Sequence, residues 1–238
     1  MSVSWFERSN DAVPAHDDWL SPAELTCFAA LRFPKRRADW LLGRWTAKCA
    51  VAAVVDERLE FADIEICAAR SGAPTVLIRG DRGRVNISLS HRAGIACCAI
   101  TLDAIAVGCD LEVVEPRSPA FVSDYFTADE RAMIAGSGAA ERSRLVALLW
   151  SAKESALKAL GIGLRADTRS VSVTEPSSSR DLVTCDMVWR RLAVKSGDGN
   201  LHGWWQCSGE LVRTVVCGGV PDVTVVHAEF ARRTVVHQ

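Results

Sequence analysis

The sequence predicts an α/β protein, with α+β layering, built from two similar subdomains that each pack a small sheet on a long helix. Both halves begin with a capping box ahead of a long amphipathic helix. The segment Trp-Thr-Ala-Lys at 45–48 recurs as Trp-Ser-Ala-Lys at 150–153, and short strand-like runs follow each helix. We expect the two units at 1–103 and 104–238, with a ligand cleft between them. Chance similarity between two amphipathic helices is the alternative.

The first half opens with Ser21-Pro22-Ala23-Glu24, a capping box with proline at the first helical position. Pro34 interrupts the helical pattern, and its apolar periodicity then predicts a second helix over 35–56. Short runs punctuated by glycine predict strands at 64–68, 75–78, 85–89, 95–102 and 106–114.

The second half repeats this order. Thr127-Ala128-Asp129-Glu130 is another capping box, and the apolar positions after it predict a helix over about 142–160. Further strands are predicted at 170–174, 183–189, 204–208 and 211–217, whereas polar composition predicts loops at 175–181 and 195–202.

The composition is that of an ordinary soluble globular protein, 49% hydrophobic and 24% charged over 238 residues. The net charge of −1 argues against a dedicated nucleic-acid binder. No apolar run is long enough to span a bilayer, and the N-terminal segment lacks the basic flank and apolar core of a signal peptide. Nine cysteines, never spaced as CxxC, indicate a reducing cytoplasm and no structural zinc.

Acidic side chains in one predicted strand and one predicted helix form the first candidate site. Asp110 and Glu112 are two residues apart, so both point to one face of a strand. Trp150, Glu154 and Lys158 share one stripe of a helix. If strand and helix meet, the set suits a divalent cation and a phosphate, because Mg²⁺ takes one or two carboxylates together with substrate phosphates. A solvated strand face and a surface ion pair are the alternatives.

A basic row on the first long helix forms the second candidate site. Arg37, Arg44 and Lys48 lie along one edge of the apolar face, and Lys35 and Arg36 stand just before them. Cations at the rim of a buried surface suit a phosphate held at the mouth of a cleft. A solvated helix face is the alternative.

The third candidate is the strand end Ser88-Leu89-Ser90-His91-Arg92, where His91 and Arg92 can both donate to an anion. A structural histidine is the alternative. Upstream, Gly72-Ala73-Pro74 forms a tight turn that either offers backbone groups to a flat ring or is only a turn. The chain carries no GxGxxG, Walker, GxSxG or HExxH motif, so the common nucleotide, serine-hydrolase and zinc-protease signatures give no lead.

Taken in order, these segments resemble the 4′-phosphopantetheinyl transferase superfamily, and the two-halved length resembles its surfactin-type branch. The resemblance is carried by Arg-Arg-Ala-Asp-Trp-Leu-Leu-Gly-Arg-Trp-Thr-Ala-Lys (36–48), Ser-Gly-Ala-Pro (71–74), Ser-Leu-Ser-His (88–91), Gly-Cys-Asp-Leu-Glu (108–112), Phe-Thr-Ala-Asp-Glu (126–130) and Trp-Ser-Ala-Lys-Glu-Ser-Ala-Leu-Lys (150–158). The GxDxE and WxxKES…K pair at this spacing is specific, whereas the other pieces are individually weak.

The resemblance implies a pseudo-two-fold pair of subdomains with coenzyme A and Mg²⁺, or alternatively Mn²⁺, in the cleft. It implies transfer of phosphopantetheine to a serine of an acyl- or peptidyl-carrier protein with release of 3′,5′-ADP, in a cytoplasmic monomer that binds neither nucleic acid nor membrane. Secondary metabolism, such as siderophore or antibiotic synthesis, is the expected setting. A non-catalytic nucleotide- or carrier-binding module and a metal-dependent phosphodiesterase are the alternatives.

Motif position in the family also implies individual roles. Asp110, Glu112 and Glu154 would hold the metal, and Glu154 would accept the serine proton, directly or through water. Lys153 and Lys158 would stabilise charge on the phosphates. The remaining coenzyme A contacts would be Arg37, Arg44, Lys48, Gly72, Ala73, Pro74, Ser90, His91 and Arg92, with the basic residues on the 3′-phosphate and the turn near the adenine. Ala73, Arg92 and Cys109 depart from the family, which more often has lysine, a small residue and isoleucine or valine there.

Overall fold

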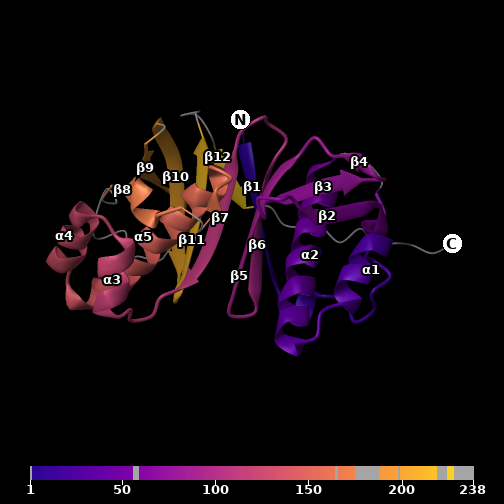
Figure 1. Ribbon diagram of the computed structural model, residues 1–238, viewed down its shortest axis with the longest axis horizontal. Helices are drawn as coiled ribbons and strands as arrows, with labels where there is room; N and C mark the ends of the chain where they lie inside the picture. Colours follow the sequence, from indigo (N-terminus) through magenta and orange to yellow (C-terminus); the bar gives the residue numbers. More distant parts are fainter. Residues whose placement is uncertain are drawn as a thin grey trace.

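Two long helices cover the outer faces of two sheets that pack against each other in the middle of the molecule (Figure 1). The computed structural model describes residues 2–55, 59–163, 166–174, 188–197, 199–218 and 224–227. Helix α2 (Pro34–Val54) lies over the first sheet and α5 (Ala139–Ala159) over the five-stranded sheet. The predicted mixed α/β class is confirmed.

The described strands form three sheets. The first has the order β12-β1-β6-β5, from Thr224–His227, Ser2–Ser9, Ile95–Thr101 and Asn86–Arg92. A small sheet has the order β2-β3-β4, from Ile64–Ala68, Pro74–Ile78 and Asp81–Arg82. The five-stranded sheet has the order β7-β11-β10-β9-β8, from Val107–Val113, Leu211–Gly218, Gly199–Ser208, Arg190–Ser196 and Val171–Val173.

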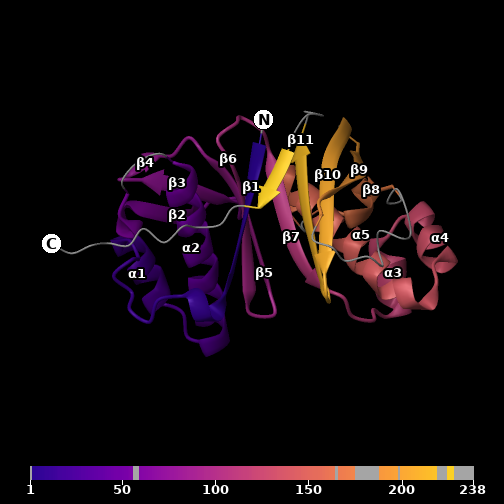
Figure 2. The same ribbon diagram turned by 180° about the vertical axis from the view of Figure 1, so that it is seen from behind.

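One strand connects the two halves of the chain. β12 pairs in parallel with β1, the two lying side by side in Figure 2, whereas the other described strand pairs are antiparallel. The first sheet therefore contains a strand from far beyond residue 104. The division into 1–103 and 104–238 stays a prediction.

Alternation along the central strands decides which side chains reach the site. In β6, Cys97 and Ala99 pack toward the five-stranded sheet. In β7, Cys109 and Leu111 pack into the same layer between the sheets. Because successive side chains of a strand point to opposite faces, Asp110 lies on the other face of β7, toward α5. The sequence predicts that Asp110 and Glu112 share one face of this strand and meet the helix, and this is the face toward α5.

In the first half, a buried lysine–glutamate pair joins α1 (Pro22–Ala29), α2 and β2. The Nζ atom of Lys48, whose side chain is 0% exposed, lies 2.5 Å from Oε2 of Glu24. Glu24 closes the predicted capping box with Ser21 and also accepts the backbone N–H of Ile66 at 3.0 Å. One glutamate thus fixes the start of a helix, a helix interior and a strand.

The second half contains the same arrangement around α4 (Ala128–Gly136), α5 and β8. Lys153 Nζ lies 2.9 Å from Oε2 of Glu130, and the lysine side chain is again 0% exposed. Glu130 closes the capping box with Thr127 and accepts the backbone N–H of Val173 at 2.9 Å. The recurring sequence segments therefore share a recurring set of interactions, while a rotation axis relating the halves stays a prediction.

Two predicted boundaries are wrong. α5 begins at Ala139 rather than near 142, with Gly138 as its N-cap. Of the stretch 195–202, predicted as a loop, residues 195–196 belong to β9 and residues 199–202 to β10, and the two strands pair with each other. The alternation that marks a strand lies just before this stretch, where Leu192 and Val194 of β9 are buried, and Gly199 has a φ of +139°, which favours glycine.

The sequence predicts neither β1 nor the short helix α3 (Pro119–Tyr125). The predicted loop 175–181 and most of the predicted strand 183–189 lie outside the described residues. Among the helices that the structure describes, none combines the length and apolar character needed to cross a bilayer.

Candidate active site between β7, α5 and β5

The acidic face of β7 lies directly against the backbone of α5. A Cβ atom added to Gly108 would fall 1.8 Å from the carbonyl oxygen of Ser155 and 2.6 Å from the backbone nitrogen of Ala159. Only a residue without a side chain permits this approach. The glycine of the GxDxE motif therefore sets the distance across which strand and helix side chains interact.

Lys158 of α5 joins two of the three carboxylates. Its Nζ donates to Oδ1 of Asp110 at 2.8 Å and lies 3.9 Å from Oε2 of Glu154. Burial is the largest single effect and opposes the charge of this ammonium group, but the neighbouring acidic groups, Asp110 foremost among them, together outweigh burial and raise the pKa of Lys158 above its ordinary value. The lysine is therefore cationic at neutral pH and offsets part of the negative charge.

Asp110 is 2% exposed and has one carboxylate oxygen without a partner. Its Oδ1 accepts the hydroxyl of Ser90 at 2.7 Å as well as the Lys158 ammonium, whereas Oδ2 accepts no hydrogen bond. A buried polar atom left unpaired costs about 1–3 kcal/mol, and more when it is charged. A ligand that supplies positive charge at Oδ2 would remove this cost.

The donor set fits a hard divalent cation such as Mg²⁺ or Mn²⁺. Among the described residues, no three histidine, cysteine, aspartate or glutamate side chains stand close enough to hold an ion unaided. Mg²⁺ does not need such a cage, because it keeps several waters and binds through one or two carboxylates plus substrate phosphates. The unpaired Oδ2 of Asp110 meets that requirement.

Glu154 sits in the most perturbed environment of the three carboxylates. Burial, followed by the negative charge of Asp110, raises the pKa of Glu154 to about 7, against the opposing effect of Lys158. A carboxylate with such a pKa exchanges its proton readily near neutral pH. The group therefore has the properties of a general base or acid in addition to those of a metal ligand.

Donors from three separate segments hold Glu112. Trp150 donates its indole N–H to Oε1 at 3.2 Å, Arg117 donates Nη2 to Oε2 at 3.3 Å, and Arg92 Nε lies 3.6 Å from Oε2. Burial and the charge of Asp110 raise the pKa of Glu112, whereas the two arginines act in the opposite direction. Both oxygens of Glu112 are thus engaged.

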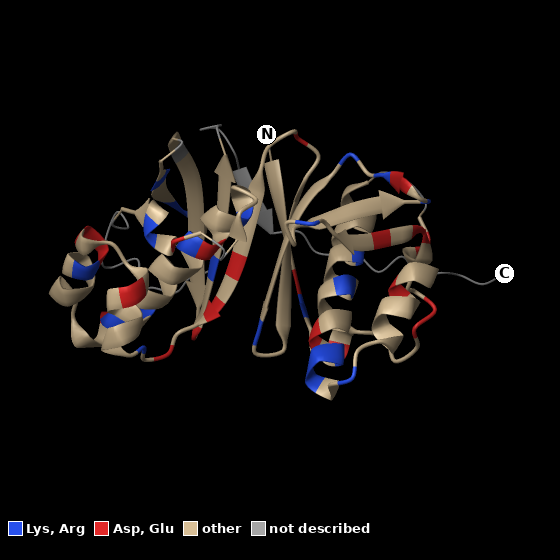
Figure 3. Ribbon diagram, viewed as in Figure 1, with Lys and Arg blue, Asp and Glu red and all other residues tan. Residues whose placement is uncertain are grey.

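A pocket of about 570 Å³ lies between the start of α2 and the end of β5. Its lining residues are Phe33, Lys35, Arg36, Asp39, Trp40, Gly43, Arg44, Leu89, Ser90 and His91. Figure 3 shows the basic colour gathered at the N-terminal end of α2 and acidic bands on β7. Because Ser90 lines the pocket and also donates to Asp110, the basic pocket adjoins the acidic cluster.

Arg44 is the most enclosed cation of this pocket. Its Nε is buried without a hydrogen-bond partner, lies 3.8 Å from Oε1 of Glu24, and its guanidinium lies over the ring of Trp40. Burial lowers the pKa of Arg44, although the Glu24 carboxylate opposes this effect. A partly desolvated guanidinium with a free donor is suited to a phosphate. His91, 3.8 Å from Asp39, is the second anion donor at the pocket.

The structure places three of the predicted ligand residues away from the pocket and the acidic cluster. Lys48 and Lys153 lie in buried ion pairs and donate to backbone carbonyls, so neither ammonium group faces the pocket or the acidic cluster. Arg37 donates to the carbonyls of Phe28 and Leu31 and is not among the pocket residues. Local pattern cannot show that Lys48 and Lys153 point inward, because the carbonyls that they contact lie 13 to 29 residues away along the chain.

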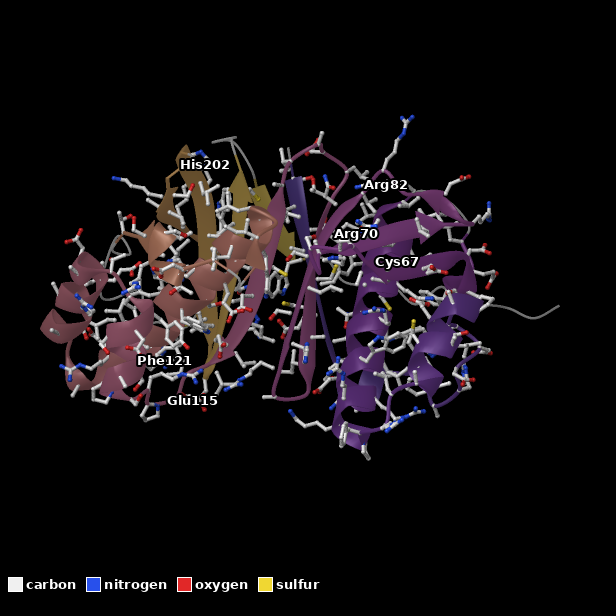
Figure 4. The ribbon with its side chains drawn as sticks, in the orientation of Figure 1. Cys67, Arg70, Arg82, Glu115, Phe121 and His202 are labelled. Atoms are coloured by element: carbon white, nitrogen blue, oxygen red, sulfur yellow. The ribbon has the colours of Figure 1, made fainter. Side chains whose placement is uncertain are left out.

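Arg92 lies at the acidic cluster instead of the phosphate pocket. Its Nη2 donates to Oε1 of Glu115 at 2.7 Å, and Arg117 Nη1 contacts the same oxygen at 3.0 Å. Figure 4 places Glu115 and Phe121 toward the lower edge of the second half. Arg92 therefore crosses from the first sheet to carboxylates that follow β7.

The turn Gly72–Pro74 lies outside the pocket lining. Gly72 has φ +90°, and its N–H donates to the carbonyl of Ala69, which closes the turn between β2 and β3. Figure 1 shows this turn at the end of the small sheet nearer the middle of the molecule. Its proximity to an adenine ring stays a prediction.

Sequence reasoning missed Arg117, Glu115, Asp39 and Phe33. Arg117 and Glu115 lie within seven residues of Asp110, in a polar run after the strand. Their closeness to the acidic motif could have marked them as candidate site residues. Asp39 falls one turn after Lys35 on the same helix, 3.7 Å from its ammonium group. Phe33, 71% exposed, precedes the helix and carries no pattern that marks a pocket.

Comparison with known proteins gives a family match in the second half of the chain and several similar synthases. Residues 106–205 match the model of the 4′-phosphopantetheinyl transferase superfamily. A holo-[acyl-carrier-protein] synthase of Streptococcus sanguinis is 39% identical over 87 residues, covering 35% of this chain and 72% of the relative. The synthase of Geobacillus kaustophilus is 33% identical over 90 residues (36% and 69%), and that of Limosilactobacillus reuteri 29% over 112 residues (44% and 92%).

Proposed function

The chain belongs to the 4′-phosphopantetheinyl transferase superfamily, and we propose that it transfers phosphopantetheine from coenzyme A to a serine of an acyl- or peptidyl-carrier protein, releasing 3′,5′-ADP. The observation that carries the proposal is the meeting of Asp110, Glu154 and Lys158 beside a basic pocket that shares Ser90 with them. Carboxylates suit a cation on a pyrophosphate, and a basic pocket suits a separate phosphate. Coenzyme A presents both groups.

In the proposed reaction the serine oxygen attacks the phosphorus that bears the pantetheine arm. The bond from that phosphorus to the bridging oxygen breaks, and 3′,5′-ADP leaves with the bond electrons. Glu154 accepts the serine proton, directly or through water. Lys158 holds a fixed positive charge beside the same carboxylates, where it can offset charge on the phosphates.

Asp110, Glu112 and Glu154 would hold Mg²⁺ or Mn²⁺. When bound, the ion would neutralise the pyrophosphate and stabilise the leaving group. The unpaired Oδ2 of Asp110 supports this assignment. The other two carboxylates would complete the protein's share of the coordination.

Arg44 and His91 would receive the 3′-phosphate, together with Lys35 and Arg36 at the mouth of the pocket. Arg44 offers a buried free donor, and the other three line the same pocket. The turn Gly72–Pro74 would lie toward the adenine. The surfactin-type branch, the monomeric state and the cytoplasmic setting belong to the proposal as well.

Intact mass spectrometry of a panel of apo carrier proteins, incubated with coenzyme A and Mg²⁺, tests the reaction and identifies the partner. A mass gain of one phosphopantetheine on a carrier is the expected result, and EDTA should abolish it. Glu154→Gln should remove nearly all turnover while leaving the fold intact; carrier modification at the normal rate would contradict the catalytic role. Cleavage of coenzyme A without any carrier would instead indicate a phosphodiesterase, and binding without product a non-catalytic module.

A further inference from the structure

We propose that Trp150 is the positioning residue for Glu112, so that its indole N–H fixes this carboxylate for metal binding; the inference rests on the transferase function proposed above. Trp150 is 8% exposed, and its Nε1 donates to Oε1 of Glu112 at 3.2 Å. The contact joins α5 to β7 beside Asp110 and Glu154. A large aromatic residue in this helix thus has a polar task in addition to packing.

The chemistry of an indole suits this task. A carboxylate oxygen has two lone pairs, so Oε1 can accept the indole N–H and still coordinate an ion. The indole is uncharged and does not repel a divalent cation. Arg117 and Arg92, which approach Oε2, are charged and would compete with a cation for Glu112. Trp150 is therefore the donor that can stay in place when the site is filled.

The ring of Trp150 is itself held in place. Phe121 and Tyr125 of α3 pack edge-on against it, with centroids at 5.0 and 5.1 Å. Arg117 in turn lies over the ring of Phe121 at 5.1 Å. Since α3 supports the indole and also stacks with the guanidinium that holds Oε2, the orientation of Glu112 depends on a connected set of contacts. Hydrogen-bond partners that orient a metal ligand in this way typically change metal affinity 10–100-fold when removed.

The first half of the chain supplies a matched control. Trp45 occupies the corresponding place in the segment that ends at Lys48, and packs against the rings of Trp19 and Phe61 at 5.2 and 4.7 Å. The residue after Lys48 is Cys49, where the second half has Glu154. Replacing Trp45 by phenylalanine removes an indole from an equivalent helix position without touching the acidic cluster.

The experiment titrates the full-length protein with Mn²⁺ in the absence of coenzyme A and measures free Mn²⁺ by electron paramagnetic resonance. Wild type, Trp150→Phe and Trp45→Phe are compared, and the Tm of each is recorded. We expect Trp150→Phe to raise the Kd for Mn²⁺ at least about tenfold, and Trp45→Phe to leave it within about twofold at a similar loss of Tm. Trp150→Phe should also raise the Mn²⁺ concentration for half-maximal carrier modification more than it lowers the rate at saturating metal.

Equal Mn²⁺ affinity in wild type and Trp150→Phe would overturn the inference. An equal loss of Mn²⁺ affinity in Trp150→Phe and Trp45→Phe would also overturn it, because it would indicate a general effect of the smaller ring. Absence of Mn²⁺ binding by the wild type would also overturn it. Carrier modification by the wild type is read separately. If the wild type modifies a carrier but the two variants bind Mn²⁺ with the same affinity, the proposed function stands and the inference fails. If the wild type modifies no carrier, the proposed function fails, and the comparison of Mn²⁺ affinities still decides whether Trp150 positions Glu112.

Discussion

A single added methyl group at Gly108 should separate the two elements that carry the site. The Cβ of Gly108→Ala would lie 1.8 Å from the Ser155 carbonyl oxygen, whereas ordinary van der Waals contact begins near 3.4 Å. The neighbour is helix backbone, so α5 must withdraw by the difference, about 1.6 Å, or deform. Overpacking of a core typically costs about 1–3 kcal/mol, and this case belongs at the upper end. For a chain of this size, about 3 kcal/mol corresponds to a fall in Tm of roughly 6–12 °C.

The functional loss should exceed what stability alone explains. Lys158 donates to Asp110 at 2.8 Å, a contact that cannot survive a helix shift of this size without rearrangement. Misplacement of reacting groups by about 1 Å can cost around 10²-fold in rate. The assay is carrier modification by mass spectrometry below the variant's Tm. Gly136→Ala on α4, where a Cβ meets nothing within 4 Å, is the control and should change neither quantity noticeably. Wild-type Tm and rate in Gly108→Ala would refute the reasoning.

Two further predictions concern cations that the structure places in different roles. Arg44→Ala should weaken the binding of coenzyme A far more than that of 3′-dephospho-coenzyme A, because Arg44 has a free donor in the basic pocket. Calorimetry measures both affinities, and an equal loss of affinity for the two ligands would contradict a 3′-phosphate contact. Lys153→Met should lower the free energy of unfolding in urea by about 3–5 kcal/mol, since it leaves Glu130 buried and uncompensated. The folded variant should keep its KM for coenzyme A, and a raised KM at unchanged stability would restore Lys153 to the ligand site.

The acidic half of the site was predictable because it depends on the spacing of residues within one strand and within one helix. Period two places Asp110 and Glu112 on one face of a strand, and the helical repeat places Glu154 and Lys158 on one stripe. The structure brings the two faces together, as the Lys158 contacts show. What local pattern could not supply is the order of the sheets, because the pairing of β12 with β1 depends on residues more than 200 positions apart.

The buried Lys48 and Lys153 show where prediction from local pattern fails, and which feature of the sequence would have predicted their burial. Lys48 and Lys153 lie on amphipathic helices, after Arg44 and Trp45 in one case and after Trp150 in the other. A lysine on such a helix is ordinarily exposed. Burial becomes tolerable only with a paired carboxylate, supplied by Glu24 and Glu130. The signal was present in the sequence, because each lysine follows a capping-box glutamate at nearly the same distance. A repeat that preserves both members of a charge pair indicates a structural pair.

The two copies of this arrangement differ in the side chains that they place at the candidate site. After the shared lysine, the first copy continues with Cys49 and the second with Glu154, so only the second adds a carboxylate to the acidic cluster. The first copy instead places Arg44 in the basic pocket. The segment that matches the family model, 106–205, contains the carboxylates and Lys158 but none of the pocket residues. Ser90 spans the two, with its backbone in the first sheet and its hydroxyl on Asp110. A phosphate ligand that needs the pocket and the acidic cluster together can therefore bind only where the two sheets meet.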